Sequence, residues 1–288
     1  MLEGMISSPS RLHYHPRPLP YHPRPLPQVY ARHMTIALGF LTPRGVVVAA
    51  DSQETYGEVK SDTTKVLTAF HTRAEEDEDD GAIAISGAGG SDYLAYIQQE
   101  ITGAFRGRPQ DTLQQFDKEL RRLMKDFYKD HVIPFAAHPS DQHSVELVLG
   151  AQRRGDRRLW VTAESTVKAC SYGAVGSGRA YAENVLRKLR VPDDSSADKL
   201  AAFAVFAAKQ ADLYCGGETI VAHISDNFFT GPSLGEVQRW ESAFREYGKV
   251  DAAVVRYCLG LPHPDDAGTQ PLRTITASLK KLRKELSK

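Results

Sequence analysis

The chain has 288 residues, of which 41% are hydrophobic, enough for one large domain or two small ones with a sizeable core. Lysine plus arginine and aspartate plus glutamate each number 36, and this balance disfavours nucleic acid and anionic membranes as partners. The three cysteines are odd in number and scattered, and no apolar stretch approaches the roughly 20 residues of a membrane span, so we expect a cytoplasmic protein without a disulfide framework.

Residues 1–34 differ from the rest of the chain because prolines recur densely. The heptapeptide Tyr-His-Pro-Arg-Pro-Leu-Pro occurs at 14–20 and again at 21–27. Prolines at this density exclude helices and sheet ladders, so we expect a disordered, polyproline-like tail. Three interpretations remain open: a removable propeptide, a stretch upstream of a true start at Met34, and a proline-rich ligand for an aromatic groove. A start at Met34 would leave Thr35 first, because methionine before a small residue is generally trimmed.

A β-hairpin is predicted at the start of the folded region. Apolar runs at 35–41 and 46–50 flank Thr-Pro-Arg-Gly, a tetrapeptide typical of tight turns. The second run is apolar at consecutive positions, which is typical of a strand buried on both faces.

This buried strand ends in Asp51. An acid in such a place is costly unless a cation or several donors meet it, and Lys60 and Lys65 are the nearest lysines downstream. A hydroxyl on Thr35, an acid and a lysine therefore follow one another along one folded-back segment.

The next two strands are expected at 66–70 and 82–86. Six consecutive acids at 75–80 separate them, and because like charges repel one another and stay solvated, we expect an exposed hairpin tip there. The second strand leads into Gly-Ala-Gly-Gly at 87–90, where glycines allow a backbone N–H to approach a substrate closely.

The remaining pattern alternates helices and strands. Apolar residues at helical spacing predict two helices, followed by three strands, two helices and a last strand. Two blocks of strands, each followed by a helix pair, predict an α+β fold in which two antiparallel sheets face each other under outer helices. The expected ranges are 93–105 and 113–127 for the first helices, 145–149, 159–163 and 169–173 for the strands, and 179–189, 197–212 and 219–224 for the last elements.

Two motifs in the second half contain candidate site residues. A Gly-Ser-Gly turn at 176–178 precedes a helix, a position where serine is most often an N-cap. The segment Asp-Leu-Tyr-Cys-Gly-Gly at 212–217 ends the long helix that follows. Beyond residue 226 the pattern changes, and 227–288 are predicted to form a helical C-terminal extension with a basic amphipathic tail.

The order of these residues resembles the proteasome-type N-terminal nucleophile hydrolases. In that family a threonine begins the first strand, Ala-Ala-Asp-Ser closes the second, and a lysine follows, as do Thr35, residues 49–52 and Lys65 here. The resemblance extends over the predicted domain 35–226 and implies a four-layer αββα sandwich. It implies a divergent bacterial protein similar to a proteasome β subunit, with Asp51 and Lys65 supporting a nucleophilic threonine.

The same resemblance implies roles for four further residues. The amide of Gly87 corresponds to the family's oxyanion donor, with Gly89 as the alternative. Ser177 would support the terminal amine of the threonine. Asp212 and Cys215 occupy the positions of an acid and a serine near the nucleophile, and a thiol is a weaker hydrogen-bonding group than that serine.

The chemistry follows from the residue types. A threonine hydroxyl is a poor nucleophile that needs an adjacent base, and as first residue Thr35 would supply its own α-amine. A nearby Lys65 ammonium would lower the pKa of that amine from its unperturbed value of about 7.7 to 8.0. The Gly87 amide would stabilise the oxyanion, and water would clear the acyl ester. No cofactor or metal is required.

The leading hypothesis is a threonine peptidase that cleaves peptides or unfolded proteins within a homo-oligomeric ring, fed by a separate ATP-dependent unfoldase, because no ATP-binding motif occurs here. The alternatives are a small-amide amidase or acylase of the same fold and an inactive ring-forming or binding subunit. A cysteine nucleophile at Cys215 is disfavoured, since no histidine has a motif-like relation to it. Substrate side-chain preference would depend on Glu54, Thr63 and Leu67.

Overall fold

The computed structural model describes residues 35–56, 59–72, 79–108, 112–135, 144–189, 194–225, 228–258 and 271–287. The predictions for the tail at 1–34 and for the acidic residues at 75–78 lie outside this set. In the described part of the chain, no helix is both long and apolar enough to cross a bilayer.

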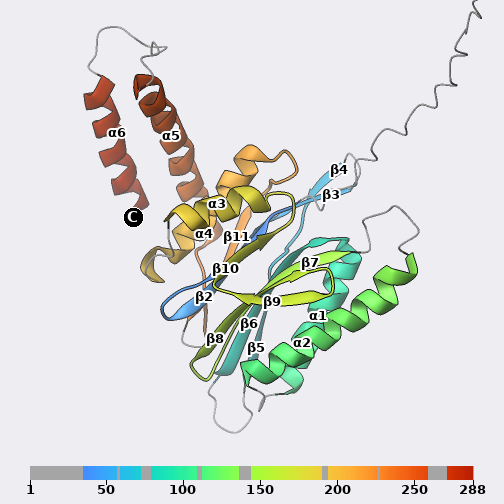
Figure 1. Cartoon of the computed structure of the whole chain (residues 1–288). Coiled ribbons are helices and arrows are strands. Elements are labelled where there is room, and N and C mark those ends of the chain that lie inside the picture. Colours follow the sequence, from blue (N-terminus) through green and yellow to red (C-terminus); the bar gives the residue numbers. More distant parts are fainter. Residues whose placement is uncertain are drawn as a thin grey trace, which may run out of the picture.

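Two antiparallel five-stranded sheets form the centre of the molecule (Figure 1). The first sheet contains, in spatial order, β10 (Tyr172–Val175), β1 (Ala37–Leu41), β2 (Gly45–Asp51), β11 (Thr219–Ser225) and β12 (Phe228–Thr230). The second contains β5 (Leu67–Thr72), β6 (Asp79–Gly89), β7 (Val145–Arg153), β8 (Asp156–Ala163) and β9 (Thr166–Cys170).

A pair of helices covers the outer face of each sheet (Figure 1). The second sheet packs against α1 (Ser91–Gly107) and α2 (Leu113–Phe127), which continues through a π-helical turn (Tyr128–Val132) and a 3-10 turn (Ile133–Phe135). The first sheet packs against α3 (Arg179–Leu189) and α4 (Asp194–Ala211). The predicted α+β architecture, with two facing antiparallel sheets under helices, is confirmed.

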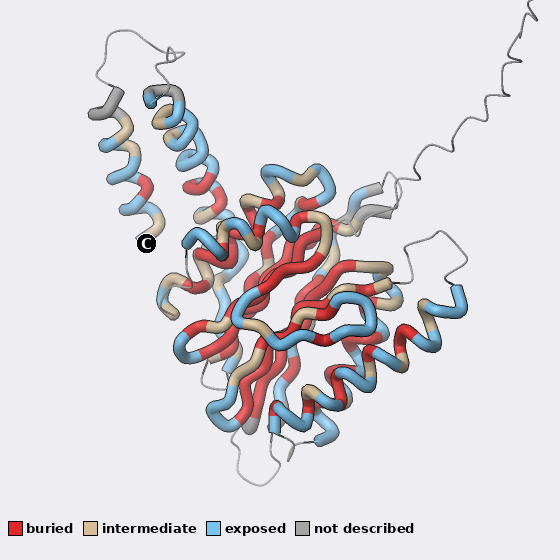
Figure 2. Tube along the Cα trace, viewed as in Figure 1, coloured by how far each residue is buried: buried red, intermediate tan, exposed pale blue. Residues whose placement is uncertain are grey.

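The buried residues form three apolar layers, one between the sheets and one under each helix pair (Figure 2). Strand β2 contributes to two of them, and all of its residues are buried. Val47 and Ala49 pack toward α4, whereas Val46 and Val48 pack toward the second sheet. Its consecutive apolar residues therefore reflect burial on both faces, as the sequence predicted.

Two details of the predicted order were wrong. The strand expected at 169–173 is two strands, because the chain crosses from the second sheet to the first at Ser171, whose carbonyl accepts the Leu41 amide. A polar hairpin of β3 (Gln53–Tyr56) and β4 (Val59–Asp62) was missed because it has no apolar alternation.

The C-terminal part of the described chain is helical. Trp240 and the apolar segment after residue 250 belong to one helix, α5 (Leu234–Cys258). α6 (Pro271–Leu286) lies beside α5, and the two helices project from the α4 side of the molecule (Figure 1). Trp240, Phe244 and Leu286 pack against the layer under α4, which attaches this hairpin to the rest of the fold.

Candidate active site

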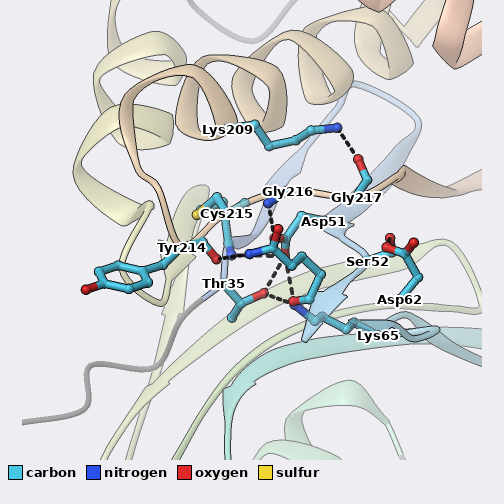
Figure 3. A network of polar contacts seen from close by, with 12 residues as sticks. Thr35, Asp51, Ser52, Asp62, Lys65, Lys209, Tyr214, Cys215, Gly216 and Gly217 are labelled. Carbon is cyan, nitrogen blue, oxygen red and sulfur yellow. Dashed lines mark hydrogen bonds and ion pairs between the residues drawn. The ribbon is translucent and has the colours of Figure 1, made fainter. Parts of the chain in front are cut away.

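Three of the predicted site residues meet where strand β2 of the first sheet ends (Figure 3). Thr35 lies two residues before β1, Asp51 is the last residue of β2, and Lys65 lies between β4 and β5. All three side chains are buried. The Thr35 hydroxyl donates a hydrogen bond to Asp51 Oδ1 and accepts one from Lys65 Nζ. The hydroxyl oxygen is thus held between a carboxylate and an ammonium.

The ammonium of Lys65 has all three of its donors engaged. Besides the Thr35 hydroxyl, it contacts Asp51 Oδ1 at 3.0 Å and the backbone carbonyl of Gln53. Charged groups are rarely tolerated at this depth without partners, and a buried ion pair needs further hydrogen bonds to offset its desolvation. The site supplies them, so both charges can persist beside the hydroxyl.

Backbone amides satisfy the rest of the Asp51 carboxylate. Oδ1 accepts from the Ile36 amide at 3.2 Å, and Oδ2 accepts from the Gly216 amide at 2.9 Å. Next to it, the Ser52 hydroxyl donates to Asp62 at 2.6 Å and accepts from the Glu218 amide at 2.7 Å. The loop after α4 is therefore bonded to the end of β2 at two adjacent residues.

The other predicted residues surround the backbone of Thr35. The Ser177 hydroxyl lies 3.5 Å from the Thr35 carbonyl oxygen and 3.9 Å from Cys215 Sγ. Cys215 Sγ lies 3.7 Å from Asp212 Oδ2. The structure thus links Asp212, Cys215 and Ser177 in a chain that ends on the threonine backbone, and its long contacts agree with the weaker bonding expected of a thiol.

The orientation of the Gly87 amide follows from strand pairing. Leu147 pairs with Gly87, and its own N–H donates to Thr162 Oγ1 on the β8 side at 2.8 Å. Because N–H and C=O of a strand residue point to the same side, the Gly87 N–H points away from β7. β5 begins at Leu67, which pairs with Ile85, so this strand does not extend to Gly87. When the register between β5 and β6 is extended by two residues, Lys65 lies opposite Gly87.

Sequence reasoning did not assign a role to four groups that shape the site. The Gln53 carbonyl and the Gly216 amide are backbone atoms, and only the glycine pair at 216–217 hinted at close backbone approach. Gly176 was noticed only as part of the Gly-Ser-Gly turn, yet it lies against the Thr35 carbonyl and donates to Glu146 Oε2 at 3.1 Å. No sequence signal identified Glu146.

Other features of the site bear on substrates and metals. Glu54, Thr63 and Leu67, expected to influence side-chain preference, are all half-buried. Over the described residues, no three His, Cys, Asp or Glu side chains are arranged to hold a metal ion.

The Cys215 thiol is held in its neutral form. Burial, together with the nearby Asp51 and Asp212 carboxylates, raises the pKa of Cys215 to about 12. At pH 8 only about one thiol in 10⁴ would be ionised, and the thiolate is the reactive form. A cysteine nucleophile at this position therefore has little physical support.

Alkylation would test this directly. With iodoacetamide at pH 8, we expect the exposed Cys258 of the folded protein to react and Cys215 to remain unmodified, with both modified after denaturation. Peptide mass spectrometry reads each cysteine separately, and Cys258→Ser should remove the fast reaction. Fast modification of Cys215 in the folded chain would contradict the assigned environment.

The comparisons with known proteins agree with this fold. No protein-family model matches the chain. The chain is 26% identical over 200 residues to proteasome subunit beta type-5 of Gallus gallus, covering 67% of this chain and 71% of that protein. The structure of Anbu, an ancestral β subunit, from Yersinia bercovieri superimposes with a TM-score of 0.58 at 14% identity, covering 80% of this chain and 99% of that one. An Anbu (Gly-1) mutant from Hyphomicrobium sp. strain MC1 gives 0.58 at 15% identity, covering 81% and 100%. The chain thus has the fold of an ancestral-type β subunit, and its sequence is similar to that of a proteasome β subunit.

Proposed function

We propose that the chain is a threonine-type N-terminal nucleophile peptidase of proteasome type. The observation that carries the proposal is the Thr35 hydroxyl, which contacts both the Asp51 carboxylate and the Lys65 ammonium. A threonine that only helps to form a strand does not require a buried ion pair beside its hydroxyl. A nucleophilic threonine, in contrast, benefits from a cation that stabilises negative charge on its oxygen. The likeness to a proteasome β subunit supports the same reading.

Catalysis in this proposal requires Thr35 to be the first residue. Its free α-amine takes the hydroxyl proton as Oγ1 attacks the substrate carbonyl carbon. Lys65 stabilises the developing charge on Oγ1, and the Gly87 amide donates to the oxyanion. The proton then passes to the departing amine, and the amide bond breaks to leave an acyl ester on Thr35. Water hydrolyses the ester and regenerates the hydroxyl and the amine.

Three supporting roles belong to the same proposal. Ser177, Asp212 and Cys215 hold the backbone of Thr35 and thereby orient its amine.

Peptides or unfolded proteins are the proposed substrates. A cytoplasmic homo-oligomeric ring, served by a separate ATP-dependent unfoldase, is the proposed assembly, with residues 227–288 as a helical extension of the hydrolase domain at 35–226.

The mature N-terminus provides the test. We expect intact mass and N-terminal sequencing of the natively expressed protein to show a chain beginning at Thr35, and a fluorogenic peptide to be cleaved by this protein but not by Thr35→Ala. Cleavage of small amides but not peptides would favour an amidase. A chain that retains Met34, together with no turnover, would leave a binding or assembly subunit.

A further inference from the structure

A largely buried lysine side chain outside the Thr35 network joins three separate segments of the chain. Lys209, near the end of α4, donates to the Gly217 carbonyl at 2.6 Å, to Thr219 Oγ1 at 3.2 Å and to Glu241 Oε1 at 2.7 Å. These contacts use all three donors of the ammonium. Figure 3 shows the first of them on the loop that passes Asp51.

Glu241 lies on α5, in the C-terminal hairpin. Its Oε1 also accepts a hydrogen bond from Thr219 Oγ1 at 2.6 Å, so it contacts the lysine and one of the lysine's own partners. The side chains of Lys209 and Glu241 are only 10% and 9% exposed. An ion pair at this depth is costly to break. Removal of Glu241 takes away the carboxylate that Lys209 contacts, whereas removal of Lys209 leaves Glu241 with the longer contact to Arg245, whose Nη2 lies 3.7 Å from Oε2.

Two of the three acceptors, Gly217 in the loop and Thr219 at the start of β11, are connected to Asp51. Gly217 follows Gly216, whose amide donates to Asp51 Oδ2 at 2.9 Å. Thr219 pairs directly with Asp51 in the ladder between β11 and β2. A shift of this loop would therefore move the amide on which one oxygen of the carboxylate depends.

We propose that Lys209 and Glu241 are positioning residues for the candidate active site, so that the C-terminal hairpin completes the site instead of only covering the core. This inference rests on the proposed function. Glu241 fixes the ammonium of Lys209, the ammonium fixes the 216–219 loop, and the loop holds Asp51 in contact with Thr35 and Lys65. Neither residue touches the reacting atoms, so each acts through the loop.

Paired variants on α4 and α5 test the proposal. Glu241→Gln and Lys209→Met change the buried pair, whereas Glu246→Gln and Lys249→Met make the same substitutions in an exposed ion pair whose atoms are 2.6 Å apart. We expect kcat for a fluorogenic peptide to fall on the order of 10-fold in the first two variants, with KM within about twofold of wild type. We also expect faster amide hydrogen exchange in the segment 212–219. The controls should match wild type in all three measurements.

The possible outcomes separate the inference from the function on which it rests. Unchanged kcat and exchange in the buried-pair variants of an active enzyme would overturn the inference alone. A wild-type protein no faster than Thr35→Ala would overturn the proposed function, and the positioning role with it. Should a single variant fail to fold, the double variant Lys209→Met/Glu241→Leu removes both charges together. In that protein, a lowered kcat at normal KM supports the proposal, and a normal kcat overturns it.

Discussion

Replacing Lys65 with methionine is expected to lower kcat/KM on the order of 10³-fold or more, because the variant loses the cation that contacts the Thr35 hydroxyl oxygen and that, in the proposed mechanism, stabilises this oxygen during attack. Stability should fall as well. Asp51 is fully buried, and removal of its ionic partner leaves a carboxylate at that depth, at a cost of roughly 3–5 kcal/mol in the free energy of unfolding. Steady-state kinetics and denaturant unfolding measure the two effects.

A double variant separates loss of catalysis from loss of fold. Lys65→Met/Asp51→Asn removes both charges, so most of the lost stability should return while activity stays low. Lys249→Met makes the same lysine substitution in an exposed pair and should change neither quantity appreciably. Recovery of activity together with stability in the double variant would show that Lys65 serves the fold and not the reaction.

The central residues of the site could be predicted because their signals are local. Consecutive apolar residues identified β2, its end identified Asp51, and the need for a cation directed attention to the next lysines. Lys65 and not Lys60 meets the acid, because the polar β3–β4 hairpin returns the chain to the end of β2 before Lys65. That hairpin carries no apolar pattern, so the choice between the two lysines depended on the resemblance.

The supporting contacts could not be predicted because they join distant parts of the chain. The Gly216 amide meets Asp51 across 165 positions, and nothing in either segment specifies the other. The change of sheet at Ser171 similarly depends on β10 pairing with β1. A backbone donor such as the Gly216 amide has no side-chain chemistry that would identify it in the sequence. A glycine motif indicates only that the backbone approaches another group closely.

Gly176 provides the most direct test of how tightly Thr35 is positioned, and we expect Gly176→Ala to lower kcat on the order of 10²-fold. This glycine has a φ of +88°. A β-carbon there would lie 3.0 Å from the Thr35 carbonyl carbon and closer still to its oxygen. Backbone atoms cannot rotate away as a flexible side chain could, so Thr35 would have to move by about 1 Å, a displacement large enough to misplace a nucleophile.

Gly155 supplies the matched control, because it also has a positive φ, +77°, but its β-carbon would meet nothing within 4 Å. Both alanine variants incur the left-handed backbone cost of roughly 1–2 kcal/mol, and thermal unfolding should show that shared loss. Only Gly176→Ala also displaces Thr35, so only that variant should lose turnover of the fluorogenic peptide. Equal activity in the two variants would mean that the Thr35 carbonyl can shift without loss of activity. The Gly-Ser-Gly turn would then cap a helix and would not hold Thr35 in position.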